Sequence, residues 1–210
     1  MKIEKDRFDP ILWCIMINRL PLILASASPR RKQLLTETGF VFETILPDAN
    51  VEDERRVNES STDYVRRLAL QKAENIANKI ERGIILGCDT VVLCGENILE
   101  KPIDRSDARR MLKKLRGEIH YVLSGICLLE KEIGVKTTAL LETDITKLMM
   151  QPISDGEIET YLDTEKWRGK SGSFGYQDGI DWIVILEGSE SNVVGLPMEL
   201  FQAMYRSLKK

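Results

Sequence analysis

The sequence has little histidine and no paired cysteines. Its 210 residues include one histidine, His120, so a Ser-His-Asp or Cys-His mechanism would depend on that residue alone. Its four cysteines form no Cys-x-x-Cys pair, which argues against a structural zinc site. Reduced thiols in a cytoplasmic protein are the simplest interpretation.

Long hydrophobic runs are also missing, so no membrane partner is expected. The segment 8–17 is apolar and follows basic residues, but acidic residues interrupt its flanks and no small-residue cleavage pattern follows. We therefore treat residues 1–19 as an N-terminal extension rather than a signal peptide. Met16 as an internal start is one hypothesis for it. Residues 20–210 are expected to form a single domain.

An excess of positive charge is absent as well. The net charge is −3 and the isoelectric point is about 5.5, whereas proteins that bind DNA or RNA are usually basic. Nucleic acid is therefore disfavoured as a partner. The charge balance still permits a local basic pocket for a mononucleotide. With 43% hydrophobic residues, the chain is long enough to bury a substantial core.

The stretch 22–32 combines a short apolar strand with the first turn of a helix. Ser28 is a suitable N-cap and Pro29 suits the first helical position. Arg30 and Arg31 follow, and cations are unfavourable at a helix N-terminus, where the macrodipole is already positive. One interpretation is a site for a di- or triphosphate. A solvated basic turn is an equally weighted alternative.

Two charged residues occupy apolar surroundings. Lys72 lies on the apolar stripe of a helix expected over 62–80 with Ser61 as its cap, where it must snorkel or find an anion. Asp89 lies inside the continuous apolar strand 84–94, where a carboxylate must be paired, hydrogen-bonded or metal-bound. Gly87 beside it indicates the close approach of another group. A functional role for Asp89 is favoured over a purely structural one.

The remaining patterns predict an α/β or α+β fold with a central mixed sheet flanked by helices. They include a long hairpin and a capping box at Ser154 and Glu157. The expected elements are a helix over 29–38, a strand over 40–46, an acidic loop over 47–60, a return strand at 98–99, a helix over 106–115, hairpin strands over 119–130 and 135–149, a helix from 154 to 162, a glycine-rich segment over 167–179, a strand over 181–186, a turn region over 188–197 and a helix over 198–208.

The unusual side chains suit a polyphosphate substrate. Carboxylates can hold a divalent ion or activate water, while cations neutralise the charge that grows on phosphate in the transition state. The residues in question are Asp89 with Arg30, Arg31, Lys72, Lys101 and Lys170.

The sequence resembles the Maf family of nucleoside triphosphate pyrophosphatases over about residues 20–205. Seven segments occur in the family's order: ASASPRR at 25–31, YVRRLALQKA at 64–73, GCDTVV at 87–92, LEKP at 99–102, GEIHYV at 117–122, GKSGSFGYQ at 169–177 and SNVVGLP at 191–197. The resemblance implies a two-lobed fold with a cleft, similar to inosine triphosphate pyrophosphatases, and a homodimer. It also implies hydrolysis of nucleoside triphosphates to the monophosphate and pyrophosphate, with a divalent metal (Mg²⁺ or Mn²⁺).

Roles follow from the resemblance position by position. Asp89 matches the proposed general base, which activates the water that attacks the α-phosphate. The phosphate-binding positions are Ser26, Ser28, Arg31, Lys72, Lys101 and Lys170. Arg30, Thr90 and Gln177 match the subgroup that acts on dTTP and UTP, and a glutamine amide can read a pyrimidine's carbonyl and imide N–H. Alternatives are the 7-methyl-GTP subgroup, which carries an aromatic residue in place of Arg30, and a non-enzymatic regulator of septum formation.

Three departures from the family pattern stand out. The family has an Asp-Glu pair in the acidic loop, and either Asp53 or Glu54 matches its acidic position, which with Asp89 would form the metal site. Gly169 replaces the family's Asp before Lys170, which is expected to loosen the orientation of that lysine. Residues 1–15 have no family counterpart.

Overall fold

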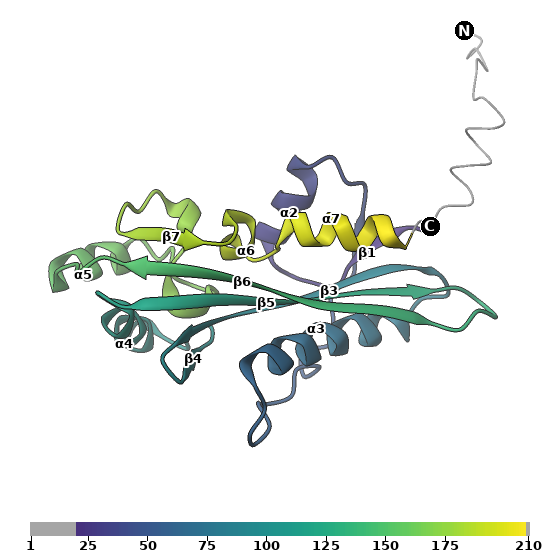
Figure 1. Cartoon of the computed structure of the whole chain (residues 1–210), viewed down its shortest axis with the longest axis horizontal. Helices are drawn as coiled ribbons and strands as arrows, with labels where there is room; N and C mark the ends of the chain where they lie inside the picture. Colours follow the sequence, from purple (N-terminus) through teal and green to yellow (C-terminus); the bar gives the residue numbers. More distant parts are fainter. Residues whose placement is uncertain (1–19, 209–210) are drawn as a thin grey trace, which may run out of the picture.

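The computed structural model describes residues 20–208, and within them the strands form one seven-stranded mixed sheet (Figure 1). The strand order is β2-β1-β3-β5-β6-β7, with β4 paired to the end of β3. β1 is parallel to both neighbours and the other pairs are antiparallel. The strands are β1 (Leu22–Leu24), β2 (Glu43–Thr44), β3 (Gly83–Cys94), β4 (Asn97–Leu99), β5 (Ile119–Lys131), β6 (Thr138–Met150) and β7 (Ile183–Glu187).

Helices cover both faces of this sheet. α3 lies on one face, while α2 and α7 pack together on the opposite face (Figure 1). α4 and α5 pack against Val122 of β5 and Leu148 of β6. The helices are α2 (Pro29–Glu37), α3 (Ser61–Ala77), α4 (Arg105–Leu115), α5 (Asp155–Asp163), α6 (Glu190–Val194) and α7 (Met198–Ser207), with short 3-10 turns at Ser171–Ser173 and Tyr176–Asp178.

Two glycines let α3 approach the sheet closely. A Cβ atom on Gly87 would overlap the carbonyl oxygen of Ala69, and one on Gly125 would overlap the carbonyl oxygen of Val65. Gly87 lies on β3 and Gly125 on β5, where Gly125 pairs with Asp89, so the helix backbone rests directly on the two strands. The close approach expected beside Asp89 is therefore confirmed, and the approaching group is α3.

The expected fold class, the long hairpin and the Ser154 capping box are confirmed. The second strand is shorter than expected because its flanking Phe40 and Phe42 pack into the α2–α7 core instead of pairing. The cap of α3 is Ser60 rather than Ser61, since the Ser60 hydroxyl accepts from the Asp63 amide.

The region 188–197 is also more regular than expected. It contains the five-residue helix α6, which begins where the Ser189 hydroxyl accepts from the Asn192 amide. The N-terminal extension and the Met16 hypothesis lie outside the described residues.

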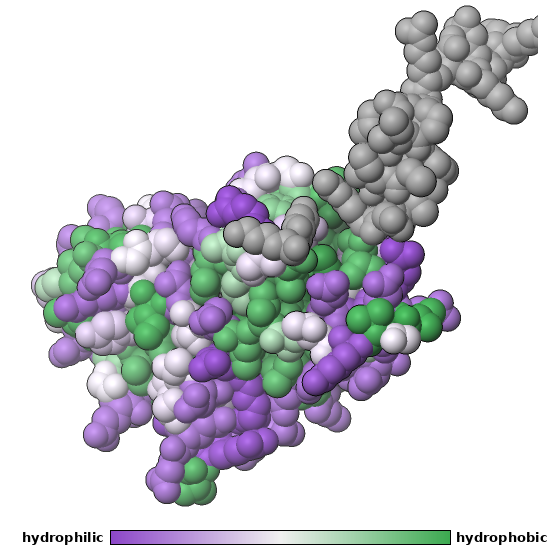
Figure 2. Space-filling model, turned by 45° about the vertical axis from the view of Figure 1, so that its right-hand side comes forward, coloured by the Kyte–Doolittle hydropathy of each residue, from purple (hydrophilic) through white to green (hydrophobic). Residues whose placement is uncertain are grey.

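In Figure 2, apolar side chains gather in the middle of the face in view, and hydrophilic ones predominate below them. Between residues 20 and 208, no helix has both the length and the apolar character needed to cross a membrane.

Candidate active site

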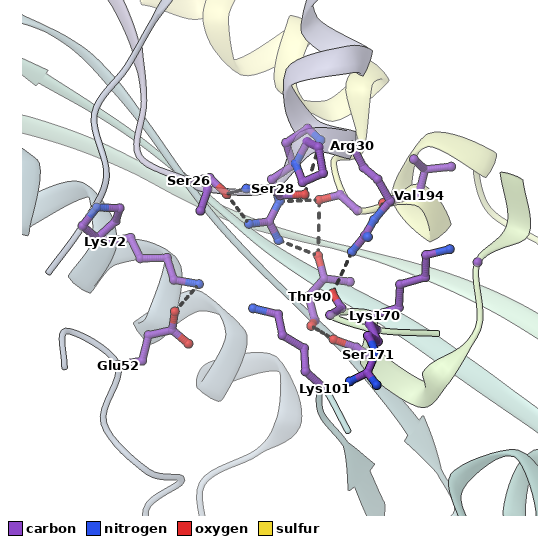
Figure 3. A pocket seen from close by; sticks show the side chains of 18 of the residues that line it. Ser26, Ser28, Arg30, Glu52, Lys72, Thr90, Lys101, Lys170, Ser171 and Val194 are labelled. Carbon is purple, nitrogen blue, oxygen red and sulfur yellow. Dashed lines mark hydrogen bonds and ion pairs between the residues drawn. The ribbon is translucent and has the colours of Figure 1, made fainter. Parts of the chain in front are cut away.

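Most of the predicted site residues line a cavity of about 480 Å³, the cleft that the resemblance implies (Figure 3). Asp89, Asp53 and Glu54 are not among its lining residues, and Asp89 is connected to the cavity wall through Lys72. Its wall combines segments far apart in the sequence. They are the opening loop at 25–31, the acidic loop at 46–52, Lys72 of α3, Thr90 and Val92 of β3, Lys101, the glycine-rich segment at 168–177 and residues 193–195.

Two carboxylates bind the ammonium group of Lys72, a residue that lines the cavity. Lys72 Nζ lies 2.5 Å from Asp89 Oδ1 and 2.9 Å from Glu52 Oε1, and it also donates to the Cys88 carbonyl at 3.4 Å. Lys72 and Asp89 are buried, at 5% and 8% exposure. Lys72 has therefore found an anion, and the Gly87 contact that seats α3 on β3 brings the two side chains together.

The acidic loop is fixed to α3 by polar residues four positions apart on that helix. Arg67 binds the Glu59 carboxylate and the Glu54 carbonyl, and Gln71 donates to Asp53 at 2.6 Å. Further along, Asn75 and Lys79 bind Asp48. The Arg67 guanidinium holds the pKa of Glu59 down at about 2, so this anchor stays ionised at neutral pH.

This anchoring corrects the predicted acidic pair. The Asp53 carboxylate is used to bind Gln71, and Glu54 contributes its backbone carbonyl to Arg67, so neither side chain joins Asp89. Glu52 is the loop residue that reaches the cavity and Lys72. Sequence matching missed it because loop spacing alone does not say which carboxylates α3 binds. The repeat of Arg67, Gln71 and Asn75 every four residues was the available signal.

The opening loop forms the wall above these carboxylates. The Ser26 hydroxyl accepts from the Ser28 amide and from Arg31 Nη1, and Ser28 caps α2 as predicted. Arg31 also donates to the Gly195 carbonyl at 2.8 Å and to Thr90 Oγ1 at 3.1 Å. Arg31 is buried and bonded to protein groups, so it fixes the geometry of the loop, and Thr90 is one of its anchors.

Arg30 connects two other segments of the wall. Its guanidinium donates to the Val194 carbonyl at 3.3 Å and to the Gly169 carbonyl at 3.1 Å. Burial and the nearby Arg31 charge lower the pKa of Arg30. The opening loop, the 191–197 segment and the glycine-rich segment are thus joined at one side chain.

Two lysines complete the site in different ways. Lys101 lines the cavity and makes no hydrogen bond or ion pair with the described residues. Burial and the neighbouring Lys72 charge lower its pKa. Lys170 is buried and ion-paired with Asp178, so the replacement of the preceding residue by Gly169 has not left it without a carboxylate. Gln177 lines the same cavity as Lys170.

This chain is similar to several known proteins. The Maf-like protein family matches residues 21–208. The dTTP/UTP pyrophosphatase of Rhodopirellula baltica is 42% identical over 183 residues, covering 87% of this chain and 79% of the relative. The dTTP/UTP pyrophosphatase of Koribacter versatilis is 38% identical over 186 residues, covering 88% and 93%. Among solved structures, the Ham1 protein of Staphylococcus aureus aligns with 89% of this chain and 98% of its own at 13% identity and a TM-score of 0.46. From residue 21 to residue 208, this chain belongs to the Maf family.

Proposed function

We propose that this protein hydrolyses nucleoside triphosphates, dTTP and UTP foremost, to the monophosphate and pyrophosphate. The observation that carries the proposal is the pairing of Glu52 and Asp89 on Lys72, a residue that lines the cavity. Lys101 lines the same cavity and makes no hydrogen bond or ion pair with the described residues. Relatives 42% and 38% identical to this chain are named dTTP/UTP pyrophosphatases.

The triphosphate lies at the end of the cavity where positive charge is concentrated. Lys101 supplies a cation that has no ion-pair partner among the described residues, and the N-terminus of α2, capped by Ser28, also lines the cavity. These groups are in place before the reaction, so they stabilise the negative charge that develops on the leaving pyrophosphate.

Asp89 is the base for the attacking water. Its carboxylate is buried and held at 2.5 Å from Lys72, so its orientation is fixed beside a lysine that lines the cavity. Asp89 takes a proton as the water oxygen bonds to the α-phosphorus. The bond from that phosphorus to the bridging oxygen breaks, and pyrophosphate leaves.

A divalent cation fits the donor set at this end. Glu52 and Asp89 both contact the Lys72 ammonium and so lie near each other, and Mg²⁺ is typically held by one or two carboxylates, substrate phosphates and waters. No cluster of three His, Cys, Asp or Glu side chains suited to a metal occurs within residues 20–208, so an ion here needs the triphosphate to complete its ligands. When bound, such an ion would neutralise phosphate charge as a Lewis acid.

The nucleobase is selected at the end of the cavity opposite the triphosphate. Gln177 lines the cavity and belongs to the same glycine-rich segment as Lys170, and the Gln177 amide has both a donor and an acceptor for a pyrimidine edge. Arg30 holds the segments that flank Gln177, and Thr90 supports Arg31. Of the three specificity positions, Gln177 is therefore the one that reads the base directly.

The test is pyrophosphate release from dTTP, UTP, CTP, GTP and 7-methyl-GTP, with and without Mg²⁺ or Mn²⁺. We expect metal-dependent release that is fastest with dTTP and UTP. Fastest release from 7-methyl-GTP would overturn the substrate assignment. No release from any nucleotide by folded protein would refute the enzymatic function and favour the regulatory alternative.

A further inference from the structure

The glycine-rich segment contains a buried ion pair that the proposed reaction does not use. The Lys170 ammonium contacts both carboxylate oxygens of Asp178, and the side chains of the pair are only 10% and 8% exposed. A buried ion pair is costly to desolvate and is often retained because it fixes a particular arrangement. Lys170 lines the cavity, so what the pair fixes lies in its wall.

Asp178 is itself held from outside the segment. Tyr161 of α5 donates its hydroxyl to Asp178 Oδ2 at 2.7 Å, and the same hydroxyl accepts from the Gly175 amide at 3.1 Å. Tyr161 is 5% exposed and packs edge-on against Trp182, which limits its movement. One fixed hydroxyl therefore binds the segment at two points, on either side of Gln177 and Tyr176.

Gly175 is the position that makes room for this arrangement. A Cβ atom there would overlap both the Lys170 ammonium and the Asp178 carboxylate. The pair therefore rests directly on the backbone of the segment, and Gln177 follows two residues later in the 3-10 turn Tyr176–Asp178. The conformation that presents Gln177 depends on the pair and on Tyr161.

The pair also lies apart from the phosphate end. In Figure 3, Lys72 and Glu52 lie on one side of the cavity, and Lys170 and Val194 lie on the other. Since Asp178 neutralises Lys170, this lysine contributes little net charge toward a triphosphate, unlike Lys101, which has no ion pair with the described residues.

From these contacts we infer that Asp178, held by Tyr161, is a positioning residue that keeps Lys170 and Gln177 in place for the nucleobase. The inference rests on the proposed function, since it names the part of that site that selects the base. It moves Lys170 from the phosphate-binding set to the base end.

The experiment compares Asp178→Asn with Asp181→Asn, which removes the same charge from an exposed position three residues further on. Two quantities are measured: KM and kcat for dTTP, and the inhibition constant of inorganic tripolyphosphate, which has phosphates but no base. For Asp178→Asn we expect KM for dTTP to rise about tenfold, with kcat within about threefold and the tripolyphosphate constant unchanged. Asp181→Asn should match the wild type.

Other outcomes overturn the inference. Tighter tripolyphosphate binding by Asp178→Asn would mean that the released Lys170 reaches the phosphates. An equal loss of dTTP and tripolyphosphate binding would indicate general collapse of the site. An unchanged KM for dTTP in Asp178→Asn would show that Asp178 does not position the site. If Asp178→Asn does not fold, Tyr161→Phe keeps the ion pair and is expected to raise KM for dTTP about threefold without affecting tripolyphosphate. An unchanged KM in that variant would also overturn the inference.

The result separates this inference from the proposed function. A wild-type protein that releases no pyrophosphate refutes the function itself. A wild-type protein that turns over dTTP while Asp178→Asn keeps the same KM refutes only the role of Asp178.

Discussion

Glu52 is the acidic-loop residue that the structure assigns to the active site, and replacing it separates this assignment from the one based on the sequence pattern. The three adjacent carboxylates, Glu52, Asp53 and Glu54, can be neutralised one at a time as Glu52→Gln, Asp53→Asn and Glu54→Gln. Of these three carboxylates, only that of Glu52 contacts Lys72, at 2.9 Å. Asp53 binds Gln71 and the Glu54 side chain is exposed.

The expected effects on stability are small for all three variants. The Glu52 side chain is 43% exposed, and ion pairs at that level of exposure contribute about 0.2–1 kcal/mol. Lys72 keeps Asp89 as a counter-charge in Glu52→Gln, so no buried cation is left unpaired. Loss of activity in this variant can therefore be attributed to the site rather than to unfolding.

The expected effects on activity differ. Removing a charged group that orients Lys72 or holds a metal ion costs about 10- to 100-fold in activity, which is about 1.4–2.7 kcal/mol in transition-state stabilisation. Asp53→Asn and Glu54→Gln should stay within about twofold of wild type, since their effect is limited to loop anchoring.

The assay is steady-state pyrophosphate release from dTTP at several Mg²⁺ concentrations, with the melting temperature of each variant as the folding control. If Glu52→Gln holds a metal less tightly, part of its loss should be recovered at high Mg²⁺. The reasoning is refuted if Glu52→Gln is fully active while Asp53→Asn or Glu54→Gln loses most of its turnover.

Three further predictions test other parts of the structure. Gly87→Ala should lower the free energy of unfolding in urea by at least about 1–3 kcal/mol, because its Cβ overlaps the Ala69 carbonyl and forces α3 away from β3; an unchanged value would contradict that contact. Burial lowers the pKa of His120 to about 4, below its ordinary 6.5, so the unfolded chain takes up the proton first and stability should fall as pH drops from about 6.5 to about 4. His120→Phe should flatten that pH profile, and an equally steep profile would exclude His120 as its source. Arg30→Trp should lower kcat/KM for dTTP and UTP about tenfold, since the bonds to Val194 and Gly169 are lost; an unchanged substrate profile would refute the specificity role.

Much of the fold was predictable because local signals and burial agree along the chain. The 119–150 hairpin and the Ser154 cap follow from alternation and capping patterns, and both are confirmed. Asp89 and Lys72 were identified because a charge in an apolar pattern requires a partner. The structure shows that they are each other's partner.

The rest depended on contacts between distant segments. Nothing local distinguishes Glu52 from Asp53, because the choice is made by Gln71 and Arg67 on a helix that follows the loop. The Lys170–Asp178 pair likewise depends on Tyr161, which lies on a different element. The second strand is short because Phe40 and Phe42 pack against the core of the folded protein. β propensity, a local property, does not predict such packing.

The most direct test of the account is the rate of pyrophosphate release from dTTP by Asp89→Asn, measured beside dTTP binding by the same variant. If Asp89 takes the proton from the attacking water, the rate should fall about 10²- to 10⁴-fold. Binding should be retained, because Lys101 and the opening loop are unchanged. Turnover near the wild-type rate would contradict the assignment of Asp89 as the base and, with it, the proposed mechanism.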